Sequence, residues 1–238
     1  MRPAFAALTA AAALAALAAC KAESPAPTAP PRETSARPTL MLLTTLPLVF
    51  GESFGLEGHG SPALAALETR YAVRPIAVAD AATLAQGKLL LMAHPLAQPA
   101  ESLVELDAWV RRGGRLLLLA DPALDWDSAL PLGDQGRPPS SFADTGLLQH
   151  WGLRLDAPDE RGPTMRRLGG HDVLTASPGT LVGKCAIAEG GLVARCRIGR
   201  GQATVVADAD FLNVGDLDGP TQHNLTALLA ELAELESR

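Results

Sequence analysis

The chain has 238 residues, of which 47% are hydrophobic, and this is enough apolar material for the core of one or two domains. Only 4% are aromatic, so leucine, alanine and valine must build that core. The formal net charge of -6 argues against a nucleic acid as partner, because affinity for nucleic acid rests largely on Lys and Arg that neutralise phosphates.

The first twenty residues are typical of a bacterial lipoprotein signal. Arg2 precedes an apolar stretch over residues 4–16 that is too short for a membrane-spanning helix. Leu17-Ala18-Ala19-Cys20 resembles the lipobox, in which the peptide is cut before an acylated cysteine. We therefore expect removal of residues 1–19 and lipidation of Cys20, where each buried methylene contributes about 0.8 kcal/mol. An ordinary signal peptide with an incidental cysteine is the alternative.

This signal predicts a protein of the bacterial envelope that faces the periplasm and has membrane lipid as its partner, in a membrane that the sequence does not identify. Residues 20–38 are rich in Pro, Ala, Ser and Thr and have no apolar period, which is typical of a flexible tether. We expect one folded domain over residues 39–238.

The first half of that domain alternates between apolar runs and one clear helix. Residues 99–112 predict the helix, since Leu103, Leu106 and Val110 share a face and Gly113-Gly114 ends it. A shorter helix over 63–70 has Ser61 as its N-cap. Strands are expected over residues 40–50, 73–78, 88–93 and 115–120.

The second half predicts a short helix over 145–151, a strand over 153–155, a hairpin over 185–198, a strand over 202–207 and a last helix from Pro220. Strands that are apolar on both faces and alternate with helices indicate a parallel sheet covered on both sides. The expected fold is therefore α/β and doubly wound, with a mostly parallel, flavodoxin-like sheet and an antiparallel hairpin added to it.

Two cysteines, Cys185 and Cys196, flank Gly190-Gly191, which is a two-residue hairpin signal. If these glycines form the turn, the cysteines lie directly opposite each other, where Cβ atoms are roughly 4.5–5.5 Å apart. An exported chain also meets an oxidising compartment. We predict a disulfide; two reduced, buried cysteines or a metal pair are the alternatives.

Polar residues follow several predicted strands, at the edge where open α/β sheets bind ligands. The candidate ligand-binding residues are Glu52, His94, Asp121, Asp208 and Asp210. Such a cluster can hold a hard cation or divide acid and base roles between carboxylates. The alternative is structural, because His94-Pro95 and Asp121-Pro122 are turn-forming pairs, and Asp208 and Asp210 can cap backbone amides.

No nucleophile motif or phosphate-binding loop accompanies these residues in the sequence. Gly199-Arg200-Gly201 joins two predicted strands, so it does not open a helix over a phosphate. Trp126, in an Asp-Trp-Asp loop, is a candidate recognition residue. We predict no catalytic residue, no metal and no cofactor.

The segment LDAWVRRGGRLLLLADP at residues 106–122 resembles a stretch of the GldG-like domains of uncharacterised ABC-type transport systems. GRGQATVVADADFL at 199–212 and His223-Asn224 are similar to later parts of the same family, so the resemblance covers residues 39–238 in order. It implies a fold like that of class I glutamine amidotransferases without their catalytic triad, with His94 near the strand end where those enzymes carry their nucleophilic cysteine.

The resemblance implies an accessory role in membrane transport or surface assembly. We therefore expect a non-catalytic envelope lipoprotein that is an accessory or binding component of such a system. Many relatives carry transmembrane helices, whereas this chain has a lipobox. The alternative function is an envelope hydrolase that uses Asp121, Asp208 and His94 with or without a divalent ion.

Overall fold

The structure is a computed structural model that describes residues 37–50 and 60–237, and residues 37–238 form one compact unit. The expected signal peptide, the lipidation site Cys20 and the candidate Glu52 lie outside the described residues. No helix within the described ranges is long and apolar enough to span a membrane.

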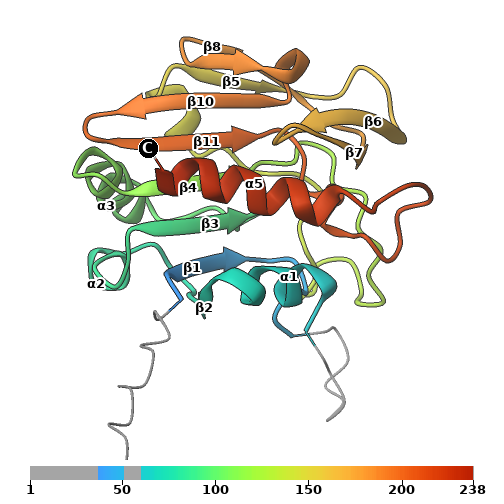
Figure 1. The fold of residues 1–238 in the computed structure, drawn as a ribbon, viewed down its shortest axis with the longest axis horizontal. Coiled ribbons are helices and arrows are strands. Elements are labelled where there is room, and N and C mark those ends of the chain that lie inside the picture. The colour runs from blue at the N-terminus through green and yellow to red at the C-terminus, as the bar shows by residue number, and fades with distance from the viewer. Residues whose placement is uncertain (1–36, 51–59, 238) are drawn as a thin grey trace, which may run out of the picture. The chain divides into compact units, whose positions relative to one another are not determined.

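A seven-stranded sheet forms the centre of the unit (Figure 1). Its strands, in spatial order, are β2 (Ala72–Pro75), β1 (Thr39–Thr44), β3 (Leu89–Ala93), β4 (Arg115–Leu119), β11 (Gly201–Val206), β10 (Val193–Ile198) and β9 (Ala186–Ala188). The first five are parallel and follow the order 2-1-3-4-5 of flavodoxin-like sheets, whereas β10 and β9 are antiparallel additions. The predicted fold class is confirmed.

Helices cover both faces of this sheet, because its strands bury alternate side chains on opposite sides. The helices are α1 (Pro62–Arg70), α2 (Ala81–Leu84), α3 (Ala100–Arg111), α4 (Leu147–His150) and α5 (Asn224–Ser237). Helices α1 and α5 pack with Leu91 and Leu117 on the face turned to the viewer in Figure 1. Helices α2, α3 and α4 pack with Leu90 and Leu116 on the other face.

The first strand is shorter than the apolar run that predicts it. The expected strand over residues 40–50 ends at Thr44. There the Thr44 Oγ1 accepts the Leu46 N–H, and the Leu48 N–H closes a tight turn on the Leu46 carbonyl, with Pro47 between them. Leu46 and Leu48 are nevertheless buried. The apolar character therefore continues into a loop that packs on the core.

Between β4 and β9, the predicted strand over residues 153–155 is present as β5 (Leu153–Asp156), whereas three further strands, β6 (Pro163–Leu168), β7 (His171–Ala176) and β8 (Thr180–Gly183), were not predicted. Strand β5 pairs with β8, and β6 pairs with β7, both antiparallel. Two 3₁₀ turns, η1 (Glu189–Gly191) and η2 (Asp210–Leu212), complete the unit.

The last helix begins at Asn224 and not, as the sequence had predicted, at Pro220. The Asn224 side chain is buried at the first residue of α5, where Oδ1 accepts the Leu174 N–H at 2.9 Å. Its Nδ2 donates to the carbonyl oxygens of Leu174 and Phe211 at 2.9 and 2.8 Å. One side chain thereby joins α5 to β7 and η2, and this gives a structural reason for the His223-Asn224 motif.

The glycines of the Gly199-Arg200-Gly201 turn permit a close approach between α3 and β11. A Cβ on Gly201 would lie 2.0 Å from the Val110 carbonyl oxygen and 2.3 Å from that of Gly114. Gly199 has φ +59° and faces the Arg111 backbone. The motif therefore permits close packing at the turn that joins β10 to β11.

The hairpin register places Cys185 and Cys196 together. Val193, Ala194 and Arg195 pair with Ala188, Ile187 and Ala186, the register expected from a turn at Gly190-Gly191. The turn itself is longer than two residues, because η1 occupies it. The Cys185–Cys196 disulfide is present, with Cα atoms 4.8 Å apart.

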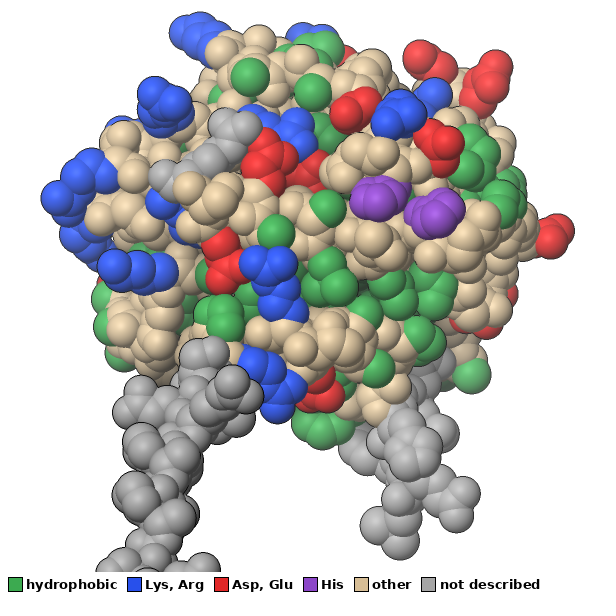
Figure 2. Space-filling view, in the orientation of Figure 1, with side chains coloured by type: hydrophobic (Ala, Val, Ile, Leu, Met, Phe, Trp, Pro, Cys, Tyr) green, Lys and Arg blue, Asp and Glu red, His purple; other side chains and the backbone are tan. Residues whose placement is uncertain are grey.

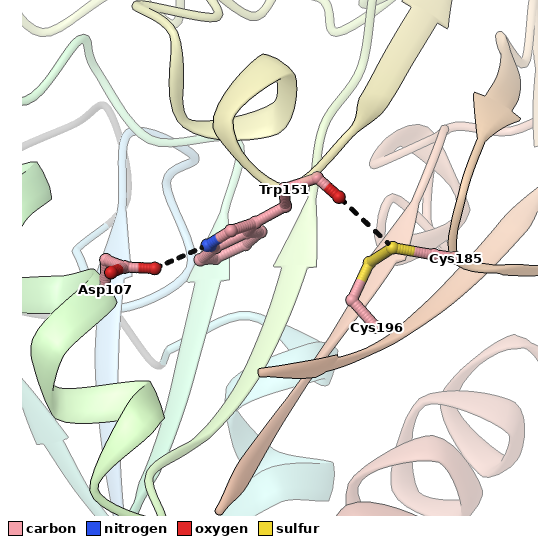
Figure 3. Close-up of a disulfide and its surroundings, with 4 residues drawn as sticks. All are labelled: Asp107, Trp151, Cys185 and Cys196. Carbon is pink, nitrogen blue, oxygen red and sulfur yellow. Dashed lines mark hydrogen bonds between the residues drawn. A yellow bond between two sulfur atoms is a disulfide. The ribbon is translucent and has the colours of Figure 1, made fainter. Parts of the chain in front are cut away.

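Figure 3 shows what surrounds this disulfide. The Cys185 Sγ lies 3.7 Å from the Trp151 carbonyl oxygen, and the Trp151 Nε1–H donates to the Asp107 Oδ1 at 2.8 Å. Asp107 belongs to α3, and its Oδ2 also accepts from Arg111 at 2.6 Å. The hairpin is therefore connected through Trp151 to the helix that precedes β4.

Replacing both cysteines by alanine is expected to lower the free energy of unfolding by about 2–3 kcal/mol, because a closed loop this short removes that much chain entropy from the unfolded state. Guanidinium denaturation of the oxidised protein and of the Cys185→Ala/Cys196→Ala variant measures the difference. Wild type treated with reductant should behave like the variant. Equal midpoints for all three samples would contradict the prediction.

Candidate functional site

Three aspartates come together beyond the carboxyl ends of β4 and β11. Asp121 follows β4, Asp208 follows β11, and Asp210 opens η2. Carboxylate oxygens of all three lie within 4.8 Å of one another, and all three residues are 0% exposed. The expectation that these carboxylates converge is correct, since neighbouring parallel strands end at one edge. Their role in ligand binding stays a prediction.

Backbone N–H groups from four segments surround the cluster. They donate to five of its six carboxylate oxygens. Asp121 accepts the N–H groups of Ala123 and Ala209, both at 2.8 Å. Asp208 accepts those of Phe211 and Ala176 at 2.9 and 3.2 Å, and Asp210 accepts that of Asp125 at 2.9 Å. The three side chains thereby hold the loop after β4, the end of β7 and η2 against the sheet. Among the described residues, no Lys or Arg forms an ion pair with them.

Burial raises the pKa of all three carboxyl groups. The pKa of Asp121 rises to about 6, because loss of hydration outweighs its hydrogen bonds. The pKa of Asp210 rises to about 8 through burial and the charge of Asp121, and that of Asp208 rises well above 3.8 through burial and both neighbours. At neutral pH Asp210 is therefore protonated, and its carboxyl shares a hydrogen bond with ionised Asp121. Burial and the two neighbouring carboxyl groups favour the protonated form of Asp208 as well.

His94 does not join the three aspartates. It follows β3 with φ +46°, is 0% exposed, and its Nε2 lies 2.8 Å from the Pro139 carbonyl oxygen. Burial lowers the pKa of His94, so the ring is neutral and Nε2–H donates to that carbonyl. The Thr45 Oγ1 donates to the His94 carbonyl oxygen at 2.5 Å. His94 therefore fastens the loop after β4 to the end of β3.

A pocket of about 370 Å³ lies in that same loop. Trp126, Arg137 and Pro139 are among its walls. The Arg137 Nη1 donates to the carbonyl oxygens of Ser128 and Leu130, so this guanidinium holds the loop. Trp126 is half-buried against the core. Trp126 was predicted as a recognition residue, whereas Arg137 was not. The only signal for Arg137 is that it is the sole cation in a loop with several aspartates.

The cluster resembles a hard-cation site in ligand type but not in accessibility. Carboxylate oxygens suit Mg²⁺ or Ca²⁺. Here five of six oxygens already accept backbone N–H groups, and no atom of the three residues reaches solvent. The donor set is therefore explained by capping of the backbone, which is the structural alternative stated for Asp208 and Asp210.

Several solved structures are similar to this chain. The exo-β-1,4-mannosidase Op5Man5 from Opitutaceae bacterium strain TAV5 has 14% identity over 84% of this chain and 36% of its own, with a TM-score of 0.48. The β-galactosidase from Rahnella sp. R3 has 13% identity over 84% and 32%, with a TM-score of 0.49. The chain thus spans about a third of these enzymes.

A smaller protein is also similar. Cytoplasmic protein STM3548 from Salmonella typhimurium has 8% identity over 83% of this chain and 98% of its own, with a TM-score of 0.49. At such identities and TM-scores these likenesses say nothing about activity. No curated protein matches the sequence.

The family comparison is more informative. The model of the family described as "ABC-type uncharacterized transport system" matches residues 37–158, just over half of the chain. The match includes the helix–strand joint at 106–122 but neither 199–212 nor His223-Asn224. The chain belongs to this family of auxiliary components of ABC-type transport systems.

Proposed function

We propose that this protein is a non-catalytic, lipid-anchored accessory component that works beside an ABC-type transport or surface-assembly system in the bacterial envelope. The family match over residues 37–158 is the observation that carries the proposal. The domain would face the periplasm and bind a component of that system.

The anchor rests on the sequence. Leu17-Ala18-Ala19-Cys20 stands where a signal peptidase for lipoproteins would cut and where acyl chains would attach. Several acyl chains hold a protein at a membrane when a single chain does not. No helix among the described residues can perform that task. Labelling with a palmitate analogue should therefore modify the wild-type chain, and a Cys20→Ser chain that still labels would refute the anchor.

The non-catalytic assignment rests on burial. The residues that a hydrolase would use, His94, Asp121 and Asp208, have no exposed atom. Their hydrogen bonds go to backbone groups and, for Asp121, also to Asp210. A general acid or base must lie within hydrogen-bond reach of the proton that it moves. Substrate and water have no access to these side chains in the folded chain, and this disfavours the hydrolase alternative.

Site-specific photo-cross-linking in intact cells tests the association. A photoreactive residue at position 132 replaces a leucine that is 89% exposed beside the Trp126 pocket, so it does not disturb the core. We expect an adduct with a subunit of an ABC-type system. The same substitution in a Cys20→Ser chain is the control and should lose the adduct. Adducts that never contain such a subunit would contradict the proposal.

A further inference from the structure

The turns that lead into β3, β4 and β11 are strongly basic. Residues 85–88, 111–115 and 197–201 contain six cations and no Asp or Glu: Lys88, Arg111, Arg112, Arg115, Arg197 and Arg200. Arg115 is half-buried and the other five are exposed. We call this set the basic edge. It lies at the amino ends of the parallel strands.

The sheet register makes these residues neighbours. Leu89 pairs with Arg115, Arg115 with Gln202, and Gln202 with Arg197. The Arg200 N–H donates to the Arg111 carbonyl oxygen at 2.9 Å, which brings the two turns together. In Figure 2 blue side chains gather along the left side, at the end from which β3 and β11 start in Figure 1.

The opposite edge of the sheet is acidic. Apart from the three buried Asp of the cluster, the segments after β4 and β11, residues 121–146 and 207–223, contain one Arg and six exposed acids: Asp125, Asp127, Asp134, Asp144, Asp216 and Asp218. Positive charge therefore gathers at one end of the strands and negative charge at the other, although the formal net charge of the whole chain is only -6. An anionic surface would attract the basic edge and repel the far edge, and this combination selects one orientation.

The chain leads into the domain on the basic edge. Leu40 of β1 pairs with Leu89 of β3, so Arg37 and Thr39 lie at the same end of the sheet as Lys88. Residues 21–36 separate Arg37 from the proposed lipidation site. Sixteen residues span at most roughly 55 Å even when fully extended. The proposed lipid anchor is therefore attached to the end of the domain where the cations gather.

We infer that the basic edge is a membrane-facing surface that binds anionic phospholipid headgroups and orients the domain with its acidic edge away from the bilayer. This inference rests on the anchor in the proposed function. Each Lys or Arg near an anionic surface strengthens the association about fivefold. The acids of the far edge do not cancel this attraction, because charges more than about 8 Å apart are largely screened at physiological ionic strength.

Lysine footprinting tests the inference, because Lys88 and Lys184 are the only lysines in residues 37–238. Lys88 belongs to the basic edge, and Lys184 lines a pocket with Arg197. The full chain, purified from membranes, is reconstituted into vesicles of phosphatidylcholine with or without phosphatidylglycerol and exposed to an amine-reactive reagent. Both lysines should react several-fold more slowly on phosphatidylglycerol vesicles, and high salt should remove the protection.

The Arg112→Glu/Arg197→Glu variant changes two exposed residues of the basic edge. We expect the ratio of membrane-facing to free orientations to fall by at least about 25-fold, since two attractions of about fivefold each are lost and two repulsions are added. Arg161→Glu/Arg166→Glu makes the same change of charge at exposed positions in and beside β6, and should behave like wild type. Equal lysine reactivity on the two kinds of vesicle, or equal effects of the two variants, would overturn the inference.

Vesicle flotation separates this inference from the anchor. If the chain floats with pure phosphatidylcholine vesicles but phosphatidylglycerol does not protect its lysines, the anchor is supported and the membrane-facing role of the basic edge is refuted. A chain that floats only with phosphatidylglycerol, in a salt-dependent way, supports the basic edge and refutes the anchor.

Discussion

Replacing Asp210 by asparagine is expected to stabilise the protein by several kcal/mol at pH 8 and to change little at pH 4. The pKa of Asp210 is about 8 in the folded chain, against an ordinary value of 3.8. For each pH unit between these two pKa values, the free energy of unfolding changes by about 1.4 kcal/mol. The folded state therefore holds a proton that the unfolded state has released, and stability falls as pH rises from about 4 to about 8.

Asparagine reproduces the protonated form of that side chain. Its Oδ1 can accept the Asp125 N–H, and its amide can donate to Asp121, so the hydrogen bonds of Asp210 are kept. Urea denaturation at pH 4, 6 and 8 measures the change. The dependence of unfolding free energy on pH should be shallower in Asp210→Asn by about 1.4 kcal/mol per pH unit. An unchanged slope would show that Asp210 is ionised in the folded state.

Replacing Asp208 by alanine is expected to destabilise the protein by roughly 2–6 kcal/mol at pH 5. Two buried N–H groups, those of Phe211 and Ala176, lose their acceptor, and each costs about 1–3 kcal/mol. At pH 8 the loss should be smaller, because burial and the charges of Asp121 and Asp210 raise the pKa of Asp208, so that wild type itself loses stability as the pH rises.

Asp208→Asn should be intermediate, because its amide oxygen still accepts one of the two N–H groups. Asp127→Ala is the control at an exposed acid near the cluster, and we expect it to stay within about 0.5 kcal/mol of wild type. Thermal and urea unfolding provide the measurement. An Asp208→Ala chain as stable as Asp127→Ala would contradict the capping role of the cluster.

The central sheet was largely predictable because its strands are buried on both faces. A run such as Leu89–Met92, apolar without interruption and preceded by Gly87, fits few other structures. The hairpin register was predictable because Gly190-Gly191 fixes which residues face each other. The predicted length of the first strand was wrong, because Leu46 and Leu48 can be buried without pairing with a neighbouring strand.

The β6–β7 pair escaped prediction although a signal was present. Gly169-Gly170 marks its turn as Gly190-Gly191 marks the other hairpin, and both glycines have positive φ. The side chains of β6 are mostly exposed, so the strand lacks the apolar alternation of a half-buried strand. Its pairing depends on β7, whose buried face packs on α5 and η2, and this is tertiary information.

The candidate site was predictable in position but not in accessibility. The convergence of Asp121 and Asp208 follows from the parallel arrangement of β4 and β11. Their burial depends on the loop after β4 and on β7, which cover the edge and whose path the sequence does not specify. The same loop supplies the Pro139 carbonyl oxygen that accepts a hydrogen bond from the His94 Nε2–H.

The two outer strands of the sheet have a consequence for crowded membranes. Strand β2 has four residues and includes Pro75, which has no N–H to donate, and β9 has three residues next to the Cys185–Cys196 bond. Neither outer strand presents a long row of unpaired backbone N–H and C=O groups with which a strand of a second molecule could pair. If the proposed anchor holds many copies at high density in a membrane, short edge strands would protect their sheets from pairing into aggregates, and copies would associate through side-chain surfaces.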